Sequence, residues 1–265
     1  MVVWITGASS GIGEACAYEY ARQGAQQADP VRLILTASSP AKLEKVAEAC
    51  VRMGAEAYVL PCDLSDPKAV EALTAEAWAH YGVIDTAFLN AGISQRTTVE
   101  DTSMGMIRQL MEINYFAPVA IAKTVLPKML EAGGGHIAVT TSIAGRFGFP
   151  LRCGYCSSKH ALYGFFETLQ AEYSDRNIRV TIVCPGRVRT NISLRALDKG
   201  GQPHGKMDPG QGGGLSPDQA AKIIQKAIDK GKREVLVGRK ELIMVYVKRF
   251  FPGLCAKIAK RIKPM

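Results

Sequence analysis

Short apolar runs alternate with longer amphipathic stretches along most of this chain, and the alternation limits the folds that the chain can adopt. Several short runs are apolar on both faces, which is typical of strands buried in a parallel sheet. The amphipathic stretches between them are long enough to be crossover helices. The pattern predicts an α/β protein with a doubly wound parallel sheet, with strands at residues 2–5, 31–35, 57–61, 86–90, 136–140, 179–183 and 234–237 and helices at residues 14–23, 41–52, 67–80, 106–130, 157–173 and 217–230.

The composition favours one large core. The chain has 265 residues, of which 47% are hydrophobic and 22% are charged. We expect one domain over residues 1–240 and a separate tail over residues 241–265. Residues 191–216 hold seven glycines and show little periodicity. Because a loop of this length inside a compact domain is usually a lid or disordered, we interpret it as a substrate-binding lid.

The tail mixes apolar and basic side chains in the manner of an amphipathic helix, for example Ile243, Met244 and Phe250 with Lys248 and Arg249. Segments of this kind lie in membrane interfaces, with the apolar face among acyl chains and the cations on anionic headgroups. The alternative is a helix packed on the domain or on a second subunit. The sequence leaves both interpretations open.

The net charge is +9, which favours a phosphorylated cofactor, an anionic membrane surface or a nucleic acid as a partner. No basic stripe interleaved with aromatic residues is present in the middle of the chain, so we do not expect nucleic-acid binding. The start of the chain does not resemble a signal peptide, and no window reaches about 18 consecutive apolar residues. We therefore expect a cytoplasmic protein, with peripheral membrane contact through the tail left open.

The seven cysteines are odd in number and scattered, which fits a reducing compartment better than a disulfide framework. Cys153 and Cys156 form a Cys-x-x-Cys pair, a pattern that also occurs in redox and zinc sites. Zinc would require a second pair of ligands, and Tyr155 inside the motif has another interpretation. We expect no metal site here.

The first predicted strand turns through glycines into a helix, in the sequence Thr6-Gly7-Ala8-Ser9-Ser10-Gly11-Ile12-Gly13. Such a turn needs positive φ angles, allows a pyrophosphate to approach the backbone closely, and presents a helix N-terminus to the anion. The segment therefore predicts a phosphate cradle for a dinucleotide.

Tyr155 and Lys159 are four residues apart in a predicted helix, so they lie on one face about one turn from each other. An ammonium group at that distance stabilises a phenolate and lowers the tyrosine pKa from about 10. Such a phenol can exchange a proton while a hydride moves to or from a cofactor. With Ser142 thirteen residues before the tyrosine, the motif indicates a nicotinamide-dependent oxidoreductase.

From about Val2 to Lys230 these motifs resemble the short-chain dehydrogenases/reductases, a family with the Rossmann fold. The resemblance implies that Ser142 hydrogen-bonds the substrate carbonyl, that Tyr155 is the acid/base, and that Lys159 lowers its pKa and holds the nicotinamide ribose. It implies that Asn114 completes a proton relay. The remaining cofactor contacts that it implies are Gly7, Ser9, Ser10, Gly11, Ile12, Gly13, Ser38, Asp63, Leu64, Asn90, Ala91, Gly92, Pro185, Gly186, Val188 and Thr190.

Two positions bear on how closely the chain follows this family. The family commonly has a second asparagine where this chain has Leu89, so one hydrogen bond within the sheet is in doubt. The second predicted strand ends in Thr36-Ala37-Ser38-Ser39, without the acidic residue that would repel a 2′-phosphate. The hydroxyl groups and Lys42 favour NADP over NAD.

The segments Asn90–Arg96 and Gly154–Leu162 look like the branch that holds hydroxysteroid dehydrogenases and the dehydrogenase/reductase member 7 proteins. That likeness implies apolar carbonyl or secondary-alcohol substrates such as steroids or retinoids, and a homodimer or homotetramer. The alternative function is a non-catalytic protein that binds a dinucleotide as a redox sensor or docks on membranes as a scaffold. Loss of a catalytic residue would favour it, and none is lost.

Overall fold

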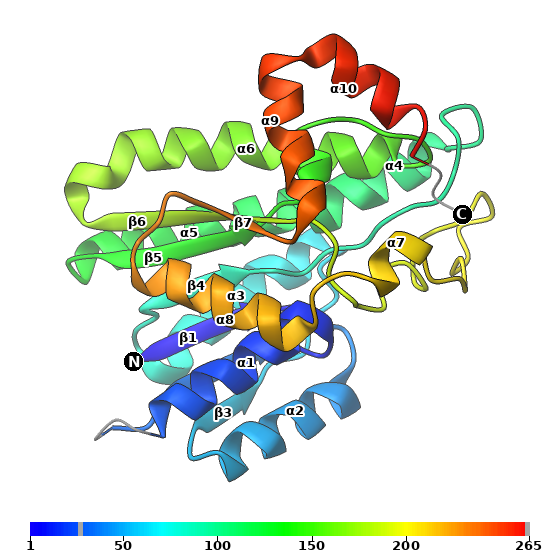
Figure 1. The fold of residues 1–265 in the computed structure, drawn as a ribbon. Helices are drawn as coiled ribbons and strands as arrows, with labels where there is room; N and C mark the ends of the chain where they lie inside the picture. The colour runs from blue at the N-terminus through cyan, green and yellow to red at the C-terminus, as the bar shows by residue number, and fades with distance from the viewer. Residues whose placement is uncertain (26–28, 263–265) are drawn as a thin grey trace.

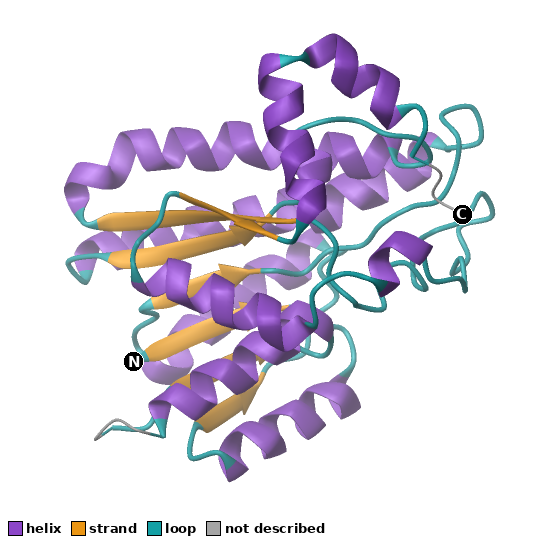
Figure 2. Ribbon diagram, in the orientation of Figure 1, coloured by secondary structure: helices purple, strands orange, loops and turns teal. Residues whose placement is uncertain are grey.

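The computed structural model describes residues 1–25 and 29–262, so the last three residues of the tail lie outside it. Its centre is a seven-stranded sheet in the order β3-β2-β1-β4-β5-β6-β7 (Figures 1 and 2), and all strand pairs are parallel. The strands are β1 (Val2–Thr6), β2 (Arg32–Thr36), β3 (Glu56–Val59), β4 (Thr86–Leu89), β5 (Gly135–Thr140), β6 (Ile178–Pro185) and β7 (Glu234–Val237).

Helices cover both faces of this sheet, as the α/β prediction requires (Figure 2). One face carries α1 (Gly11–Gly24), α2 (Pro40–Arg52) and α8 (Pro217–Asp229), and the other carries α3 (Pro67–Tyr81), α5 (Ala117–Glu131) and α6 (Cys153–Tyr173). In β1, Val3 and Ile5 pack toward α1 while Val2 and Trp4 pack toward the opposite layer, because successive strand residues point to opposite faces. The doubly wound prediction is therefore confirmed.

The strand order reverses between β1 and β4, where a doubly wound sheet opens a crevice at the carboxyl ends of its strands. The two turns at this point are joined directly. The backbone amides of Asn90 and Ala91 donate to Oγ1 of Thr6 at 3.0 and 3.2 Å. The turn after β4 is thus fixed beside the glycine turn after β1.

The predicted helix over residues 106–130 is interrupted. The structure has α4 (Met104–Met111), a π-helical turn (Glu112–Phe116) and then α5. Pro118 has no N–H to offer the carbonyl of Asn114 four residues earlier, and its ring crowds that carbonyl, so the regular α-helical ladder cannot continue through this point. The wider turn carries Asn114 into the protein, where it is fully buried.

The helix predicted over residues 157–173 begins earlier, at Cys153, so Tyr155 lies in its first turn. The tail forms a 3₁₀ turn (Lys240–Leu242), α9 (Ile243–Phe250) and α10 (Pro252–Ala259), which stand above α4 and α6 (Figure 1). One face of this helix pair packs on the domain through Met244, Cys255 and Phe147. Of the helices in the described residues, none combines the length and the apolar character needed to cross a membrane.

Candidate active site

A cavity of about 300 Å³ lies at the carboxyl ends of the strands, at the crevice between β1 and β4. Nearly every residue predicted to bind the cofactor lines it, although the residues come from segments far apart in the sequence. The lining includes Gly7, Ser9, Ser10, Gly11, Ile12, Ser38, Asp63, Leu64, Asn90, Ala91, Gly92, Ser142, Tyr155, Lys159, Pro185, Gly186, Val188 and Thr190. Gly13 and Asn114 are the two predicted site residues that lie behind this lining.

The glycine turn has the geometry of a phosphate cradle. Gly7 and Gly11 have φ angles of 69° and 63°, which glycine adopts without strain. A Cβ atom on Gly7 would lie 2.8 Å from the Cα of Ala91, and one on Gly11 would lie 3.0 Å from Cγ2 of Thr190. The bare backbone and the N-terminus of α1 therefore face the cavity and suit the pyrophosphate of a dinucleotide.

Gly13 does not touch the cavity but makes the cradle possible. A Cβ atom at this position would overlap the carbonyl oxygen of Gly7 and lie 2.7 Å from Nδ2 of Asn90. The first turn of α1 packs on the turn that precedes it, and only glycine allows that approach. We therefore assign Gly13 to packing of the cradle.

Ser142, Tyr155 and Lys159 come together from β5 and the start of α6. Oγ of Ser142 accepts a hydrogen bond from the amide of Ala144 at 3.1 Å, which fixes the turn after β5. The amide of Tyr155 donates to Oε1 of Gln95 at 3.0 Å. Nζ of Lys159 donates to the carbonyl of Thr140 at 2.8 Å and lies 6.0 Å from the centroid of the Tyr155 ring.

Burial is the largest influence on the pKa of Tyr155 in this structure, and the expectation that Lys159 lowers that pKa stays a prediction. Burial raises the pKa of Tyr155 above its ordinary value, and the hydrogen bond with Ser142 and the charges of Arg152 and Arg96 offset only part of that rise. Burial also lowers the pKa of Lys159 to about 7. Desolvation of the phenolate therefore outweighs the cationic neighbours, and the net shift of the Tyr155 pKa is upward.

Asn114 joins the turn after β4 to α6. Its Oδ1 accepts from the amide of Ile93 at 2.9 Å, and its Nδ2 donates to the carbonyl of Ile93 and to Oγ of Ser158, both at 3.0 Å. A Cβ atom on Gly92 would lie 3.0 Å from Oδ1 of Asn114 and 3.3 Å from Nζ of Lys159. Asn114 therefore lies directly behind the catalytic candidates and holds their two supporting segments at a fixed spacing.

The far end of the cavity is formed by the turns after β2 and β3. Ser38 lines it, and no acidic side chain follows β2. Oδ1 of Asp63 accepts from the amide and the hydroxyl of Ser65, which orders the turn after β3. Leu89, where the family commonly has asparagine, is buried in the sheet.

The Cys153 and Cys156 thiols are free. Sγ of Cys153 lies 3.4 Å from Nε2 of Gln95, and burial raises the pKa of Cys156. A reactive cysteine requires a thiolate, so the raised pKa gives no support to a redox interpretation of this pair.

A second cavity, of about 430 Å³, adjoins the first. Ser142, Tyr155 and Gly186 line both. Its apolar wall comes from the turn after β5 and from the tail, through Phe147, Phe149, Ile143, Ile243, Met244, Ile258 and Ile262. Sequence reasoning assigned the tail to a membrane, the domain or a partner, and did not predict that it lines a cavity. The alternation of apolar and basic residues was the available signal, but it does not indicate what an apolar face contacts.

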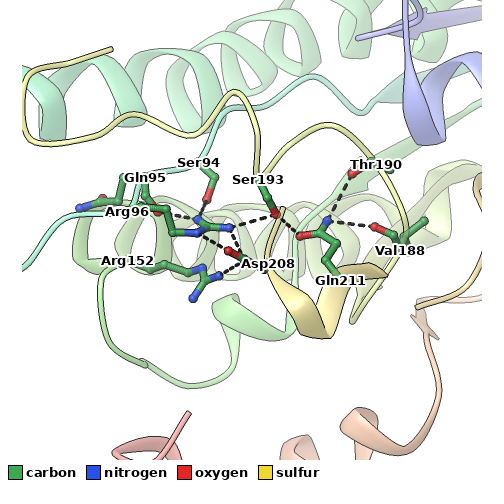
Figure 3. Close-up of polar contacts among 9 residues, drawn as sticks. All are labelled: Ser94, Gln95, Arg96, Arg152, Val188, Thr190, Ser193, Asp208 and Gln211. Atoms are coloured by element: carbon green, nitrogen blue, oxygen red, sulfur yellow. Dashed lines mark hydrogen bonds and ion pairs between the residues drawn. The ribbon is translucent and has the colours of Figure 1, made fainter. Parts of the chain in front are cut away.

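The segment predicted to be a lid, residues 191–216, contributes to the lining of this cavity and is held by a buried ionic cluster that the sequence did not indicate (Figure 3). Asp208 of the lid accepts from Arg96 and from Arg152, with Nη2 to Oδ2 distances of 2.6 Å in both cases. Nη2 of Arg96 also donates to Oγ of Ser193, and Ser193 in turn contacts Gln211. The predicted lid is thus an ordered segment with a short helix, α7 (Pro209–Gly212).

Arg195 of the lid is a further residue that the sequence reasoning missed. It lines the first cavity, and its Nη1 lies 3.4 Å from Oγ of Ser10 in the glycine turn. A guanidinium group at this place is suited to a phosphate. No motif distinguishes Arg195 from the other basic residues of the chain.

Known proteins resemble this chain in both sequence and fold. A family model described as short chain dehydrogenase matches residues 1–199. The chain is 37% identical over 262 residues to the mouse (Mus musculus) dehydrogenase/reductase SDR family member 7B, covering 97% of this chain and 79% of that protein.

Among solved structures, an alcohol dehydrogenase from the archaeon Thermococcus sibiricus, complexed with 5-hydroxy-NADP, matches with a TM-score of 0.75 and 28% identity over 90% of this chain and 96% of that chain. A short-chain dehydrogenase/reductase from Burkholderia phymatum in complex with NAD matches with a TM-score of 0.83 over 100% of this chain and 97% of that chain. Its identity is 23%, so that likeness concerns the fold alone.

Proposed function

The chain belongs to the short-chain dehydrogenase family of NAD(P)-dependent oxidoreductases, and from this premise we propose that it transfers a hydride between NADP(H) and a lipophilic carbonyl or secondary alcohol. The observation that carries the proposal is the meeting of two cavities at Ser142 and Tyr155. One cavity has the backbone cradle of a dinucleotide site, and the other has an apolar wall. Reacting groups from both sides can reach the same phenol.

The cofactor, Ser142 and Tyr155 have separate roles in the proposed reaction. A bound nicotinamide supplies or accepts the hydride. In reduction, Oγ of Ser142 donates a hydrogen bond to the substrate carbonyl, and Oη of Tyr155 donates the proton that the oxygen acquires. In oxidation, the phenolate of Tyr155 takes that proton back.

Lys159 and Asn114 support this proton transfer in different ways. Lys159 is buried beside the Tyr155 ring, so any interaction that keeps its ammonium charged also favours the phenolate. Asn114 keeps the turn after β4 and α6 at the spacing that the tyrosine and lysine require. We propose Asn114 as a positioning residue and Lys159 as a catalytic and ribose-binding residue.

The preference for NADP rests on the end of β2. Ser38 and Ser39 present hydroxyl groups where an acidic residue would repel a 2′-phosphate, and the net charge of +9 favours a phosphorylated cofactor. Related solved structures bind either form, including one from Sphingobium yanoikuyae in complex with NADPH. The proposal for this chain therefore depends on its own residues.

We also propose that the tail contacts an anionic membrane surface peripherally. Five large apolar side chains of the tail are exposed among its described residues, namely Ile243, Tyr246, Phe250, Phe251 and Leu254. Lys248, Arg249 and Lys257 lie in the same two helices. This arrangement suits an interface with anionic headgroups, and flotation with phosphatidylserine vesicles tests it, since equal recovery with neutral vesicles would contradict the role of the cations.

A homodimer or homotetramer through α4, α5 and α6 is proposed on the same family basis. Met104 and Phe116 are 58% and 50% exposed at the start of α4 and at the π-helical turn, which leaves apolar surface for a second copy. Light scattering on the purified protein measures the mass, and the mass of a monomer would overturn the proposal.

The decisive experiment combines binding with turnover. The protein is titrated with NADPH and NADH by nicotinamide fluorescence, and steroid, retinoid and aromatic carbonyls are then supplied. We expect tight NADPH binding and a turnover that falls by about 1,000-fold in Tyr155→Phe, the size typical of a lost general acid. Tyr173→Phe, at the far end of α6, is the control. Tight binding without turnover on any carbonyl would favour the non-catalytic sensor instead.

A further inference from the structure

The second cavity is unusually basic for a site that takes a purely apolar molecule. Among the described residues that line it, four are basic and two are acidic: Arg96, Arg152, Arg187 and Lys240 against Asp208 and Glu241. The apolar wall contributed by the tail lies in the same cavity. The lining is therefore amphipathic, with an excess of positive charge.

Arg152 is the basic residue whose bonding is incomplete. Its side chain is 10% exposed, and its Nη2 donates to Asp208. Its Nη1 is buried and has no hydrogen-bond partner within the part of the chain that the structure describes. A buried donor of a charged group that lacks a partner is costly, and Arg152 lines the cavity, so a small rotation of its guanidinium group would bring this nitrogen within reach of an acceptor on a ligand.

Asp208 accepts hydrogen bonds from both arginines but carries only one negative charge. Its two oxygens already accept from Nε and Nη2 of Arg96, at 3.1 and 2.6 Å, before Arg152 is counted. One carboxylate is thus shared by two buried guanidinium groups, and one positive charge remains without a counter-ion in this cluster (Figure 3). Burial and the charge of Arg96 lower the pKa of Arg152 to about 10, so it stays charged at neutral pH.

Arg152 lies close to Tyr155, the proposed acid/base, both in the sequence and in the lining of the second cavity. It immediately precedes α6, and Tyr155 follows it within the first turn of that helix. Both residues line the second cavity. The guanidinium group lies 4.8 Å from the centroid of the Phe149 ring, a cation–π contact that steadies it at the boundary between the charged and apolar parts of the lining.

We propose that the second cavity binds an amphiphilic carbonyl compound that carries an oxyanion, a carboxylate or a phosphate, and that the guanidinium group of Arg152 turns toward the cavity so that its Nη1 donates to that group. The apolar part of the ligand lies against the wall formed by the tail. This inference rests on the proposed function, because it names the substrate class of the same cavity. The proposed ligand differs from a neutral steroid or retinoid because it carries a negative charge.

Binding is measured first, independently of catalysis. The protein saturated with NADP⁺ is titrated by calorimetry with decanoate, decyl phosphate and decanol, which share one chain and differ in the head group. We expect at least one anion to bind about 10-fold more tightly than decanol, the size of a charged hydrogen bond. The preferred anion distinguishes a carboxylate from a phosphate ligand. Equal binding of decanol and both anions would overturn the proposal.

Variants of Arg152 test whether this residue provides the positive charge that the anion contacts. Arg152→Gln is expected to remove most of the anion preference, whereas Arg52→Gln, at an exposed arginine whose side chain is 70% accessible, should retain it. Arg152→Lys keeps a cation beside Asp208 but loses the free nitrogen, so it should show an intermediate preference. If Arg152→Gln does not fold, the lysine variant decides, and a full anion preference in it would contradict the role of Nη1.

Turnover separates this inference from the proposed function. A keto fatty acid and its methyl ester are compared as substrates with NADPH. A higher kcat/KM for the acid, reduced in Arg152→Lys, supports both proposals. Anion binding without turnover of either compound leaves the inference standing and overturns the proposed function, whereas equal turnover of acid and ester leaves the proposed function and overturns the inference.

Discussion

The two cavities that meet at Tyr155 are built from different kinds of chain. The dinucleotide cavity is formed by the turns that follow strands of the sheet, with Gly7, Ser38 and Asn90 as examples. The second cavity is formed largely by the lid, the tail and the charged side chains of Arg96 and Arg152. The turns of the sheet form most of the first cavity, to which Arg195 and Gln211 also contribute, whereas the second cavity depends largely on segments around the sheet.

This difference explains how the substrate cavity can change while the cofactor site is kept. The strand ends are fixed by parallel pairing, so their turns converge wherever the strand order reverses. The lid and the tail are held by side-chain contacts such as those of Asp208 and Met244. Changes in the tail should therefore alter substrate binding and leave the dinucleotide site intact, whereas changes in residues 191–216 can affect both cavities, because Arg195 and Gln211 line the first.

The largest effect is expected where the cavities share a residue. Because burial raises the pKa of Tyr155 above about 10, the phenol is protonated at neutral pH and the phenolate fraction rises tenfold per pH unit. Alcohol oxidation, which needs the phenolate, should increase by about 100-fold from pH 7 to pH 9, whereas carbonyl reduction should stay constant. Initial rates in both directions check this.

The same profile tests the influence of Lys159. If oxidation reaches its plateau below pH 8, the ammonium lowers the pKa of Tyr155 in the working enzyme and burial does not dominate. Cofactor binding measured at each pH serves as the control, since a change in binding would imitate a change in proton transfer.

A change at the far end of the dinucleotide cavity should affect only that cavity. Ser38→Asp places a carboxylate where the 2′-phosphate is proposed to lie, and a repulsion of about 2 kcal/mol corresponds to about 30-fold weaker NADPH binding. NADH binding and the KM of the carbonyl substrate should be retained. Fluorescence titration measures the binding, and Ser174→Asp, outside both cavities, is the matched control. Equal loss of NADH binding would show that Ser38 does not discriminate between the cofactors.

Packing under the cradle gives the next largest effect. Gly13→Ala forces a methyl group against the carbonyl of Gly7 and should lower the free energy of unfolding by about 2 kcal/mol and weaken NADPH binding. Gly164→Ala, at an exposed position in α6 with open space around it, should instead raise the free energy of unfolding by about 1 kcal/mol. Urea denaturation measures both. If Gly13→Ala leaves the free energy of unfolding unchanged, the glycine turn can relax to accept the methyl group.

The smallest effect is expected at the wall formed by the tail. Ile258→Ala shortens an apolar side chain that lines the second cavity and should raise the KM of an apolar carbonyl by about fivefold, with NADPH binding unchanged. Leu254→Ala, on the exposed face of α10, should leave that KM unchanged and reduce vesicle binding. If Leu254→Ala raised the KM and Ile258→Ala reduced vesicle binding, the assignment of the two faces of the tail would be wrong.

Periodicity alone predicted the sheet, because strands and crossover helices repeat a simple pattern, and the glycine spacing predicted the cradle. The π-helical turn at Asn114 was not predicted, although Pro118 lies in the interior of the helix predicted over residues 106–130, where a proline indicates a kink or a break. The cluster of Arg96, Asp208 and Arg152 could not be predicted either. Its members are separated by up to 112 residues, and charged residues in loops give no signal of their partners.

The ionic cluster also has a consequence for the timing of the catalytic cycle. A movement of residues 191–216 that withdrew Asp208 would leave Arg96 and Arg152 as two neighbouring buried cations, which repel each other. Such a movement costs free energy, so we expect slow release of the product if it leaves by this route. The first turnover of a freshly mixed enzyme is then expected to be faster than those that follow, and raised ionic strength should change this difference little, because salt screens buried charges much less than exposed ones.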